Sequence, residues 1–147
     1  MKEYRFYGWE KADAAPASEE WAGAGDPRRL YDLLLGIWCA DTCAPRMREN
    51  WSPDNPTLGQ CSITAFLAQD IYGGKVYGVP RPDGNFHCFN DVSGCVFDLT
   101  SEQFGEEKLC YDDCPEQFRE VHFAKEEKRL RYEYLKNALA DALRKGE

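Results

Sequence analysis

The clearest pattern of apolar and polar positions lies between residues 58 and 74. Its apolar residues return every three or four positions, as they do on one face of a helix: Ile63, Phe66, Leu67 and Ile71. Gly73-Gly74 follows, and glycine adopts the left-handed conformation that ends many helices at little cost. The pattern therefore predicts a helix that begins at Cys61 and ends before Gly73.

Two further helices are predicted, one on each side of this stretch in the chain. Asp26-Pro27 is a typical helix start, because Asp caps free backbone N–H groups and Pro suits the first helical position. The stretch to Trp38 carries an apolar stripe that we assign to core packing: Leu30, Leu33, Leu34 and Ile37. A charged helix is predicted from about Ala124 to Leu143. Its expected inward residues are Leu130, Tyr134, Leu135, Ala138, Leu139, Ala142 and Leu143.

Shorter runs predict a small antiparallel sheet. Residues 75–79 form one expected strand, and a turn follows at residues 81–84. Residues 85–90 and 95–100 are rich in β-forming residues and flank a turn signal, which is typical of a hairpin. Residues 1–7 alternate loosely and are expected to add an edge strand, and residues 100–103 offer a cap and a helix start.

The hairpin places a histidine beside an aspartate. A two-residue loop at Val92-Ser93 puts His87 directly opposite Asp98, and a four-residue loop over residues 91–94 gives the same pair. Directly opposed residues point to one face, with Cβ atoms ~5 Å apart. A three-residue loop would send Asp98 to the other face. With an even loop, Phe86, Cys88, Phe97 and Leu99 are expected on the opposite face.

These elements predict an α+β fold in one domain. A small antiparallel sheet packs against the helix that starts at Cys61, and the 27–38 and C-terminal helices flank it. The chain of 147 residues is of single-domain length. We expect residues 1–25 to be an N-terminal extension, in which Trp9 and Trp21 provide anchors, and about 26–145 to form the compact core.

Composition narrows the function classes. The net charge of −8 disfavours nucleic acid, whose phosphates would be repelled, and an anionic membrane surface. No apolar run approaches ~18 residues, so no membrane span is expected. Residues 1–5 lead into no apolar stretch, so no signal peptide is expected and the predicted location is the cytoplasm.

The seven cysteines are expected to be free thiols, because nothing in the sequence directs the chain to an oxidising compartment. Two pairs have a Cys-x3-Cys spacing: Cys39/Cys43 and Cys110/Cys114. Four thiolates can hold zinc, although structural zinc sites more often use Cys-x2-Cys. Ordinary thiols near surface loops are the favoured interpretation, a zinc site is the alternative, and no cofactor is predicted.

Cys61 is the candidate nucleophile. Free N–H groups and the positive end of the helix dipole at a helix start favour the thiolate, the reactive form of cysteine. Gln60 beside it is a candidate amide donor to a developing oxyanion, together with the Cys61 N–H. The alternative for Cys61 alone is a small buried apolar residue at a helix start.

Cys61, His87 and Asp98 together predict a catalytic triad. Cys61 would attack, His87 would take the thiol proton and return it to a leaving group, and Asp98 would orient the ring. The predicted function is a cysteine hydrolase or acyltransferase acting on an amide or thioester of a small molecule or peptide. A non-catalytic binding or regulatory protein on the same scaffold is the alternative. The second histidine, His122, lies among Glu120, Lys125 and Glu126 and has no comparable partner set.

Three resemblances accompany these residues. Gly59-Gln60-Cys61 resembles the Gly-Gln-Cys-Trp nucleophile motif of transglutaminases, with Ser62 where the Trp would stand. The order Cys, His, Asp resembles the transglutaminase-like core of the papain-like superfamily. The YunG-like family of small, uncharacterised bacterial proteins is more similar still. The matching segments are residues 55–61, Gln69-Asp70 with Gly73-Gly74, His87 with Asn90, residues 98–104, and Arg131-Tyr132 with Leu135.

This last resemblance covers about residues 30–140 and implies a fold rather than a substrate. Asn90, one of its matching residues, joins Gln60 as an expected oxyanion or substrate-binding residue. Trp51 is a further candidate, because the long irregular connection over residues 39–57 delivers the chain to Cys61 and is expected to wall the cleft. The alternative for Trp51 is a core anchor.

Overall fold

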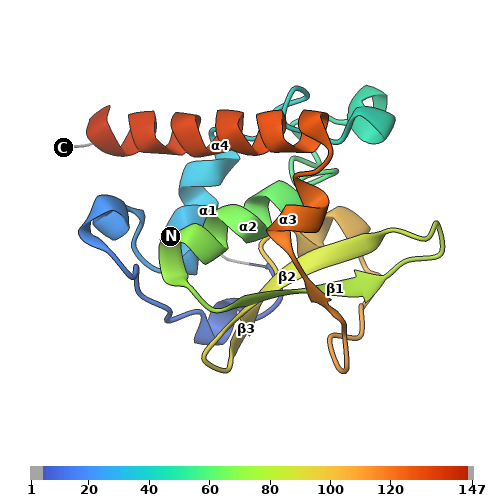
Figure 1. The fold of residues 1–147 in the computed structure, drawn as a ribbon, viewed down its shortest axis with the longest axis horizontal. Helices are drawn as coiled ribbons and strands as arrows, with labels where there is room; N and C mark the ends of the chain where they lie inside the picture. The colour runs from blue at the N-terminus through green and yellow to red at the C-terminus, as the bar shows by residue number, and fades with distance from the viewer. Residues whose placement is uncertain (1–4, 146–147) are drawn as a thin grey trace.

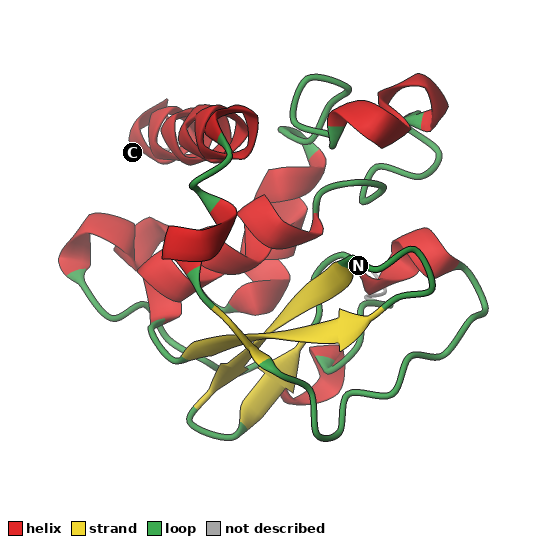
Figure 2. Cartoon of the chain, turned by 45° about the vertical axis from the view of Figure 1, so that its right-hand side comes forward, coloured by secondary structure: helices red, strands yellow, loops and turns green. Residues whose placement is uncertain are grey.

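The computed structural model describes residues 5–145, and these form three layers (Figure 1). Helix α4 (Glu126–Lys145) lies on one outer side, α2 (Cys61–Tyr72) and α1 (Pro27–Leu35) form the middle, and a four-stranded sheet lies on the other side. Figure 2 shows the same separation of the long helices from the strands. None of the helices in this described part combines the length and apolar character needed to cross a bilayer.

Helix α2 is the centre of the core. It begins at Cys61 and ends before Gly73, whose φ of 82° is in the left-handed region, so both predicted ends are confirmed. Its buried residues lie on all sides and not on one stripe: Ser62, Ile63, Thr64, Ala65, Phe66, Leu67, Ala68, Ile71 and Tyr72. A helix apolar on every side must be covered on every side. The sheet covers one side of α2, and α4 packs on another.

The sheet has the order β3-β2-β1-β4 and is antiparallel throughout. Strand β1 (Lys75–Pro80) and the hairpin strands β2 (Phe86–Val92) and β3 (Cys95–Phe97) fall where the sequence predicts them. The two-residue β4 (Glu116–Gln117) is an addition that the sequence pattern does not reveal. Of the expected edge strand at residues 1–7, the first four lie outside the described residues, and Tyr7 makes a single bridge to Asp98.

The hairpin loop lies one residue later than expected. Val92 pairs with Cys95, so the loop is Ser93-Gly94, and both of its residues have positive φ, 52° and 91°. Two positive φ values are typical of a type I′ turn, whose twist suits a hairpin. The shift moves the register by two residues, so the expected direct opposition of His87 and Asp98 is wrong. A shift of two preserves the faces, however, and both side chains still point to one side.

Shorter helical segments complete the chain. Helix α1 starts at Pro27 with Asp26 as its cap, as predicted, but ends at Leu35, before Gly36 and not at Trp38. Segment η4 (Ser101–Phe104) is a single helical turn at the expected start. The remaining short segments are η1 (Trp9–Lys11), η2 (Glu19–Ala24), η3 (Pro45–Asn50) and α3 (Arg119–His122).

The segment before α1 contributes to the same hydrophobic core. Phe6, Ala12, Trp21 and Ala24 are buried in one cluster with residues of α1 and α2. Glycine is required at the entry to α2, because Gly59 has a φ of 72° and a Cβ there would lie 2.5 Å from the Cys43 sulfur. This close approach fixes the path of the chain immediately before Cys61.

Helix α4 packs with a different face from the predicted one. Its buried residues are Arg131, Tyr132, Leu135 and Leu139, whereas Leu130 and Tyr134 are about half exposed, at 50% and 52%. The inward assignment of Leu130 and Tyr134 was therefore wrong. The physical reason is that the stripe is completed by Arg131 and Tyr132, residues whose polar ends find partners: Arg131 donates to the Thr42 carbonyl at 2.8 Å.

Candidate active site

A cleft of about 810 Å³ opens beside the start of α2. Its walls come from residues 44–47, the start of α2, the β1–β2 turn, the end of η4 and the α3–α4 region. Cys61 and His87 both line it. The expectation that the 39–57 connection walls the cleft is confirmed for residues 44–47.

Cys61 lies at an unpaired edge of β2. Its sulfur is 3.9 Å from the carbonyl oxygen of Phe86, near the first residue of that strand. Strand β3 pairs only with Asn90, Asp91 and Val92, so within residues 5–145 no strand covers this edge of β2 near Phe86. Gln60, which precedes the helix, makes no side-chain cap to it. The first N–H groups of α2 therefore remain available beside a partly exposed thiol.

His87 and Asp98 form a buried pair. The ring Nε2 of His87 lies 2.6 Å from Oδ2 of Asp98, and the two side chains are 2% and 0% exposed. The predicted contact is confirmed, although its strands are offset by two residues. Asp98 also accepts hydrogen bonds from the Thr100 N–H at 3.2 Å and from the Tyr111 hydroxyl at 2.7 Å. These donors fix the position of the Asp98 carboxylate. The His87 ring uses Nε2 for its contact with Asp98, which leaves Nδ1 for Cys61.

The thiol of Cys61 interacts with side chains on both faces of β2. Cys88 and Asn90 point toward α2, whereas His87 is on the other face. A hydrogen bond from Cys88 is the largest effect on Cys61, and together with His87 it holds the pKa of Cys61 well below the ordinary value, against burial. The pKa of Cys88 is raised in turn, first by that hydrogen bond and then by burial.

His87 is the matching cation. Burial alone would lower its pKa, but the charge and hydrogen bond of Asp98, followed by those of Cys61, raise the pKa of His87 to about 10. Lowering the pKa of Cys61 and raising the pKa of His87 both favour transfer of the thiol proton to the ring, which would give a thiolate beside an imidazolium. Such a pair can attack a carbonyl carbon and then protonate a leaving group.

Three residues expected near the reacting atoms lie elsewhere. Gln60 is fully buried, and its amide Nε2 donates to the Cys39 carbonyl at 3.2 Å. Asn90 donates from Nδ2 to the Ala65 carbonyl at 2.8 Å and so ties β2 to α2. Trp51 is half-buried and donates to the Pro56 carbonyl at 3.0 Å. None of the three is among the residues that line the cleft.

The other cysteines are free thiols. Cys39, Cys43, Cys110 and Cys114 are the four that could have held zinc. Across residues 5–145, no group of three or more His, Cys, Asp or Glu side chains is arranged to hold a metal ion. Cys114 instead donates weakly to the Cys110 carbonyl at 3.6 Å.

Several site residues were missed by sequence reasoning. The prediction that Cys88 lies on the face of β2 away from His87 is confirmed. What the prediction missed is that this face brings Cys88 to Cys61. Phe104 meets the His87 ring edge-on with centroids 4.7 Å apart, and Tyr111 bonds to Asp98. Only the position of Cys88 could have been found from the sequence. Adjacent residues of a strand point to opposite faces, so the residue next to His87 faces the helix. Tyr111 lies in an irregular stretch that no periodicity places.

Comparisons with known proteins place the chain in a family. A family model described as "YunG protein" matches residues 26–144. The chain is 33% identical over 90 residues to the "Uncharacterized protein YunG" of Bacillus subtilis (strain 168). The matched region covers 61% of this chain and 75% of that protein. No solved structure matches significantly.

Proposed function

The chain belongs to the YunG family, and we propose that it is a cysteine-dependent hydrolase or acyltransferase acting on an amide or thioester. The observation that carries the proposal is the buried His87–Asp98 pair, with Nε2 and Oδ2 2.6 Å apart, beside a partly exposed Cys61 at a helix start. A structural histidine needs neither a fully buried aspartate nor a neighbouring thiolate.

The proposed mechanism has two halves. The Cys61 thiolate adds to the carbonyl carbon of the substrate, and the first N–H groups of α2 stabilise the resulting oxyanion. The tetrahedral species collapses, the bond to the leaving amine or thiol breaks, and His87 supplies the proton that this group needs. Water or another nucleophile then gives a proton to His87, attacks the carbonyl carbon of the thioester formed on Cys61 and releases Cys61 as thiolate.

The proposed fold assignment follows from the same elements. A helix that starts at the nucleophile, a histidine on a strand and an aspartate after the neighbouring strand have the order of the transglutaminase-like core in the papain-like superfamily. Asp98 acts as the positioning residue, since it contacts the ring of His87 and does not line the cleft.

One observation favours the alternative, a binding protein without catalysis. The Gln60 amide already donates to Cys39 and is absent from the residues that line the cleft, so it does not supply the oxyanion donor expected of it. On this alternative the cleft of about 810 Å³ is a ligand site and the thiolate pair has no turnover.

An acyl-transfer assay separates the two. The protein is mixed with p-nitrophenyl acetate, and we expect a burst of about one p-nitrophenolate per chain, since a covalent intermediate forms faster than it is hydrolysed. Mass spectrometry should find acetyl on Cys61. The variant Cys61→Ala should lose the burst, whereas Cys95→Ala, which removes another partly exposed thiol, should retain it. Acetylation spread over several cysteines, with Cys61→Ala unchanged, would remove the proposal.

A further inference from the structure

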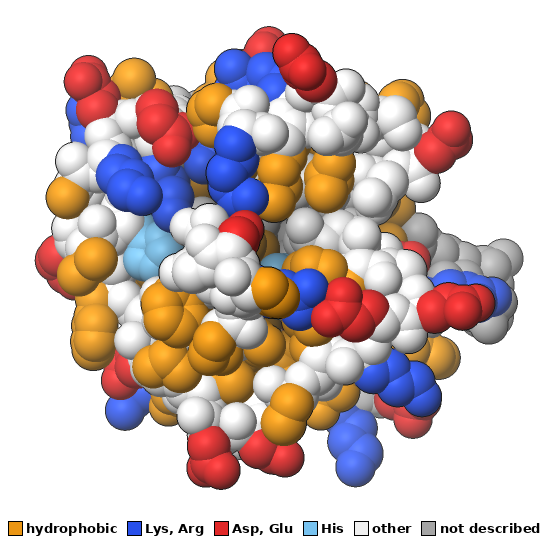
Figure 3. Space-filling model, turned by 90° about the vertical axis from the view of Figure 1, so that its right-hand side faces the viewer, with side chains coloured by type: hydrophobic (Ala, Val, Ile, Leu, Met, Phe, Trp, Pro, Cys, Tyr) orange, Lys and Arg blue, Asp and Glu red, His pale blue; other side chains and the backbone are white. Residues whose placement is uncertain are grey.

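The cleft is positively charged although the chain as a whole is negative. Its lining includes five cationic side chains against two acidic ones: Arg46, Arg81, Lys125, Lys128 and Arg131 against Asp83 and Glu127. The chain carries a net charge of −8. Figure 3 looks onto this side of the molecule and shows blue Lys and Arg side chains gathered beside a pale-blue histidine surface.

The three arginines already have carboxylate partners. Arg46 pairs with Asp83 at 3.3 Å and Arg131 with Glu127 at 2.8 Å. Arg81 meets Glu107 at 2.9 Å, and its guanidinium lies 4.5 Å from the centre of the Phe104 ring. These pairs account for the structural role of the arginines and leave the two lysines.

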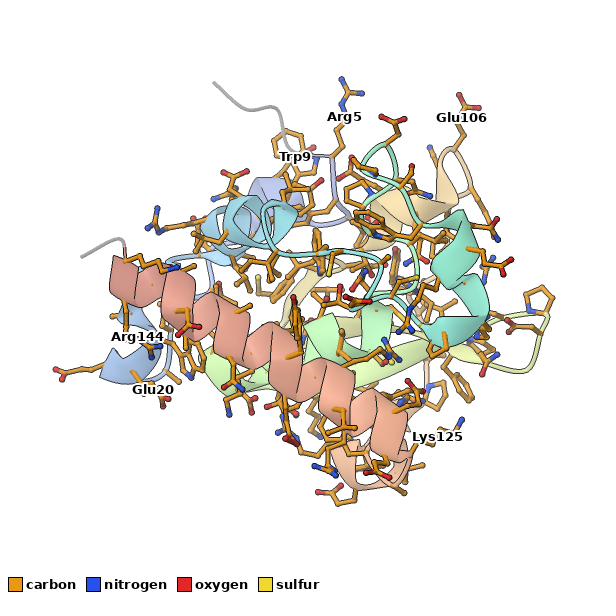
Figure 4. All side chains as sticks on the ribbon, turned by 90° about the horizontal axis from the view of Figure 1, so that it is seen from above. Arg5, Trp9, Glu20, Glu106, Lys125 and Arg144 are labelled. Carbon is orange, nitrogen blue, oxygen red and sulfur yellow. The ribbon has the colours of Figure 1, made fainter. Side chains whose placement is uncertain are left out.

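Lys125 and Lys128 have no carboxylate within ion-pair distance in the described part of the chain. Figure 4 labels Lys125 where α4 begins, at the opposite end from Arg144. Lys128 lies one turn further on and is partly buried. Removing a cation such as Lys128 partly from water without a carboxylate beside it costs free energy, which an anionic ligand in the cleft would offset.

The hydrogen bonds around Lys128 leave it free to donate. Its Nζ lies 2.9 Å from Nδ1 of His122, and Nε2 of the same ring lies 2.9 Å from Oε1 of Gln117. Because Oε1 only accepts, His122 donates from Nε2 and must accept at Nδ1. Burial, followed by Lys128, lowers the pKa of His122 to about 4, so the ring is neutral. Lys128 thus uses one N–H on a neutral partner and keeps two.

The position of these lysines relates them to the thiol. Against the larger effect of burial, the charge of Cys61 acts to raise the pKa values of both Lys128 and His122, and all three residues line one cleft. Burial lowers the pKa of Lys128, which an anion beside the amine would reverse. A lysine is a compact point charge with rotatable donors, which suits a single carboxylate.

We infer that the substrate carries a carboxylate, which Lys128 and Lys125 bind while Cys61 attacks the neighbouring amide or thioester carbonyl. The inference deepens the proposed function and rests on it for the reaction. The binding of the carboxylate, however, depends only on the two lysines and the shape of the cleft.

Two alkylating reagents that differ in charge test the inference. Iodoacetate and iodoacetamide attack the same sulfur, so the ratio of their rates at Cys61 reports the local potential and cancels changes in thiol reactivity. We expect this ratio to exceed that of glutathione at least about tenfold at low salt. It should fall toward the glutathione value in ~1 M salt, where charges are screened within about 3 Å.

Matched variants locate the effect. Lys125→Gln with Lys128→Gln should remove most of the preference for iodoacetate. Lys75→Gln with Lys136→Gln changes the net charge equally, at lysines that pair with Glu116 and Asp70 outside the cleft, and should retain it. Equal loss in both double variants, or a ratio equal to that of glutathione, would overturn the inference.

A titration without thiol chemistry keeps the two proposals distinguishable. Succinate should shift the side-chain NMR resonances of Lys128 saturably, whereas the neutral succinamide should not. If neither reagent labels Cys61 quickly but succinate binds, the catalytic proposal fails and the carboxylate site stands. If iodoacetamide labels Cys61 quickly and succinate leaves Lys128 unshifted, the carboxylate inference is wrong and the thiolate proposal survives.

Discussion

Two neighbouring side chains, Cys88 and His87, stabilise negative charge on the Cys61 sulfur. Cys88 does so from the core, where it is 1% exposed, and His87 from the other face of the same strand. Adjacent residues of a strand point to opposite faces, so one strand can serve a sulfur at its edge from both sides. This arrangement depends on the edge of β2 that β3 leaves uncovered near Phe86.

The contribution of Cys88 can be separated from its packing. Cys88→Ala removes the hydrogen bond to Cys61 and should slow alkylation of Cys61 at pH 6 about tenfold or more, since a hydrogen bond to a charged group contributes ~1.5–3 kcal/mol. Cys88→Ser keeps a donor at the same position and should stay near the parent rate. Site-resolved mass spectrometry gives both rates. Equal rates in Ala and Ser variants would assign no role to this hydrogen bond.

The Cys61–His87 pair also sets how stability depends on pH. Near neutral pH the native pair holds one proton, on His87. The unfolded pair also holds one proton, on Cys61, because the ordinary pKa of histidine is 6.5 and that of cysteine is 9.0. Equal proton numbers give no slope, so the pair contributes no change in unfolding free energy between about pH 6.5 and 9.

Replacing Cys61 by Ser should change this plateau into a decline. The charge and hydrogen bond of Asp98 still favour a proton on native His87, against the effect of burial, whereas the unfolded chain loses that proton above pH 6.5. Stability conferred by a raised pKa is lost as the pH rises, so the free energy of unfolding of Cys61→Ser should fall relative to the parent above pH 6.5. Urea unfolding at several pH values measures the difference; parallel curves would mean that no ion pair forms.

At the scale of elements, local signals predicted some helix ends but not the end of α1. Asp26-Pro27 and Gly73-Gly74 act within one or two residues, so α1 begins and α2 ends where the sequence indicates. The register of the hairpin was not available in this way, because Val92-Ser93 and Ser93-Gly94 are both plausible turns. Tertiary packing and the positive φ of Ser93 decide between them.

The approach of the chain to α2 gives a second test at this scale. Gly59→Ala adds a methyl group 2.5 Å from the Cys43 sulfur and 2.9 Å from the Ala44 nitrogen. Gly84 also has a positive φ, 85°, but has no atom within 4 Å of such a methyl group. Both variants bear the cost of a left-handed residue, roughly 1–2 kcal/mol.

Gly59→Ala should therefore lower the free energy of unfolding by about 1–3 kcal/mol more than Gly84→Ala, the usual cost of overpacking. Urea unfolding of the two variants measures this difference. Equal losses would show that the loop before Cys61 adjusts freely, and the position of the nucleophile would then not be fixed by this glycine.

At the scale of the whole molecule, the N-terminal segment belongs to the core. Trp21 is 4% exposed, and the Tyr7 carbonyl accepts from the Asp98 N–H at 3.0 Å, so this segment also supports the strand end that carries the aspartate. Sequence reasoning could not show this, because residues 10–25 have no periodicity and only Trp9 and Trp21 suggested contacts.

Trp21→Ala should therefore destabilise the whole domain, by about 3–5 kcal/mol as for other large core truncations. Trp51→Ala, at the half-buried tryptophan outside the cleft lining, should cost less and leave Cys61 labelling unchanged. Thermal unfolding followed by near-ultraviolet circular dichroism compares the two. A small effect of Trp21→Ala would show that residues 5–25 form a dispensable extension.

The candidate site was predictable where it depends on an even number of residues in the hairpin loop and on the order of Cys61, His87 and Asp98 in the chain. An even hairpin loop, whichever residues form it, places His87 and Asp98 on one face, so the pair survived an error in register. The lysines of the cleft could not be found, because α3 and the start of α4 reach it only through the packing of α4 on α2. Charge that is scattered in sequence becomes local only in the folded molecule.

The central claim is that Cys61 and His87 act as a thiolate–imidazolium pair, and the alkylation of Cys61 at pH 6 tests this most directly. Each of the seven cysteines is followed by mass spectrometry during reaction with iodoacetamide at pH 6. We expect Cys61 to react far ahead of the other six, His87→Ala to slow it sharply, and Asp98→Ala to slow it less. If Cys61 instead reacts equally fast with and without His87, or no faster than the other thiols, the pair is not functional and the account is contradicted.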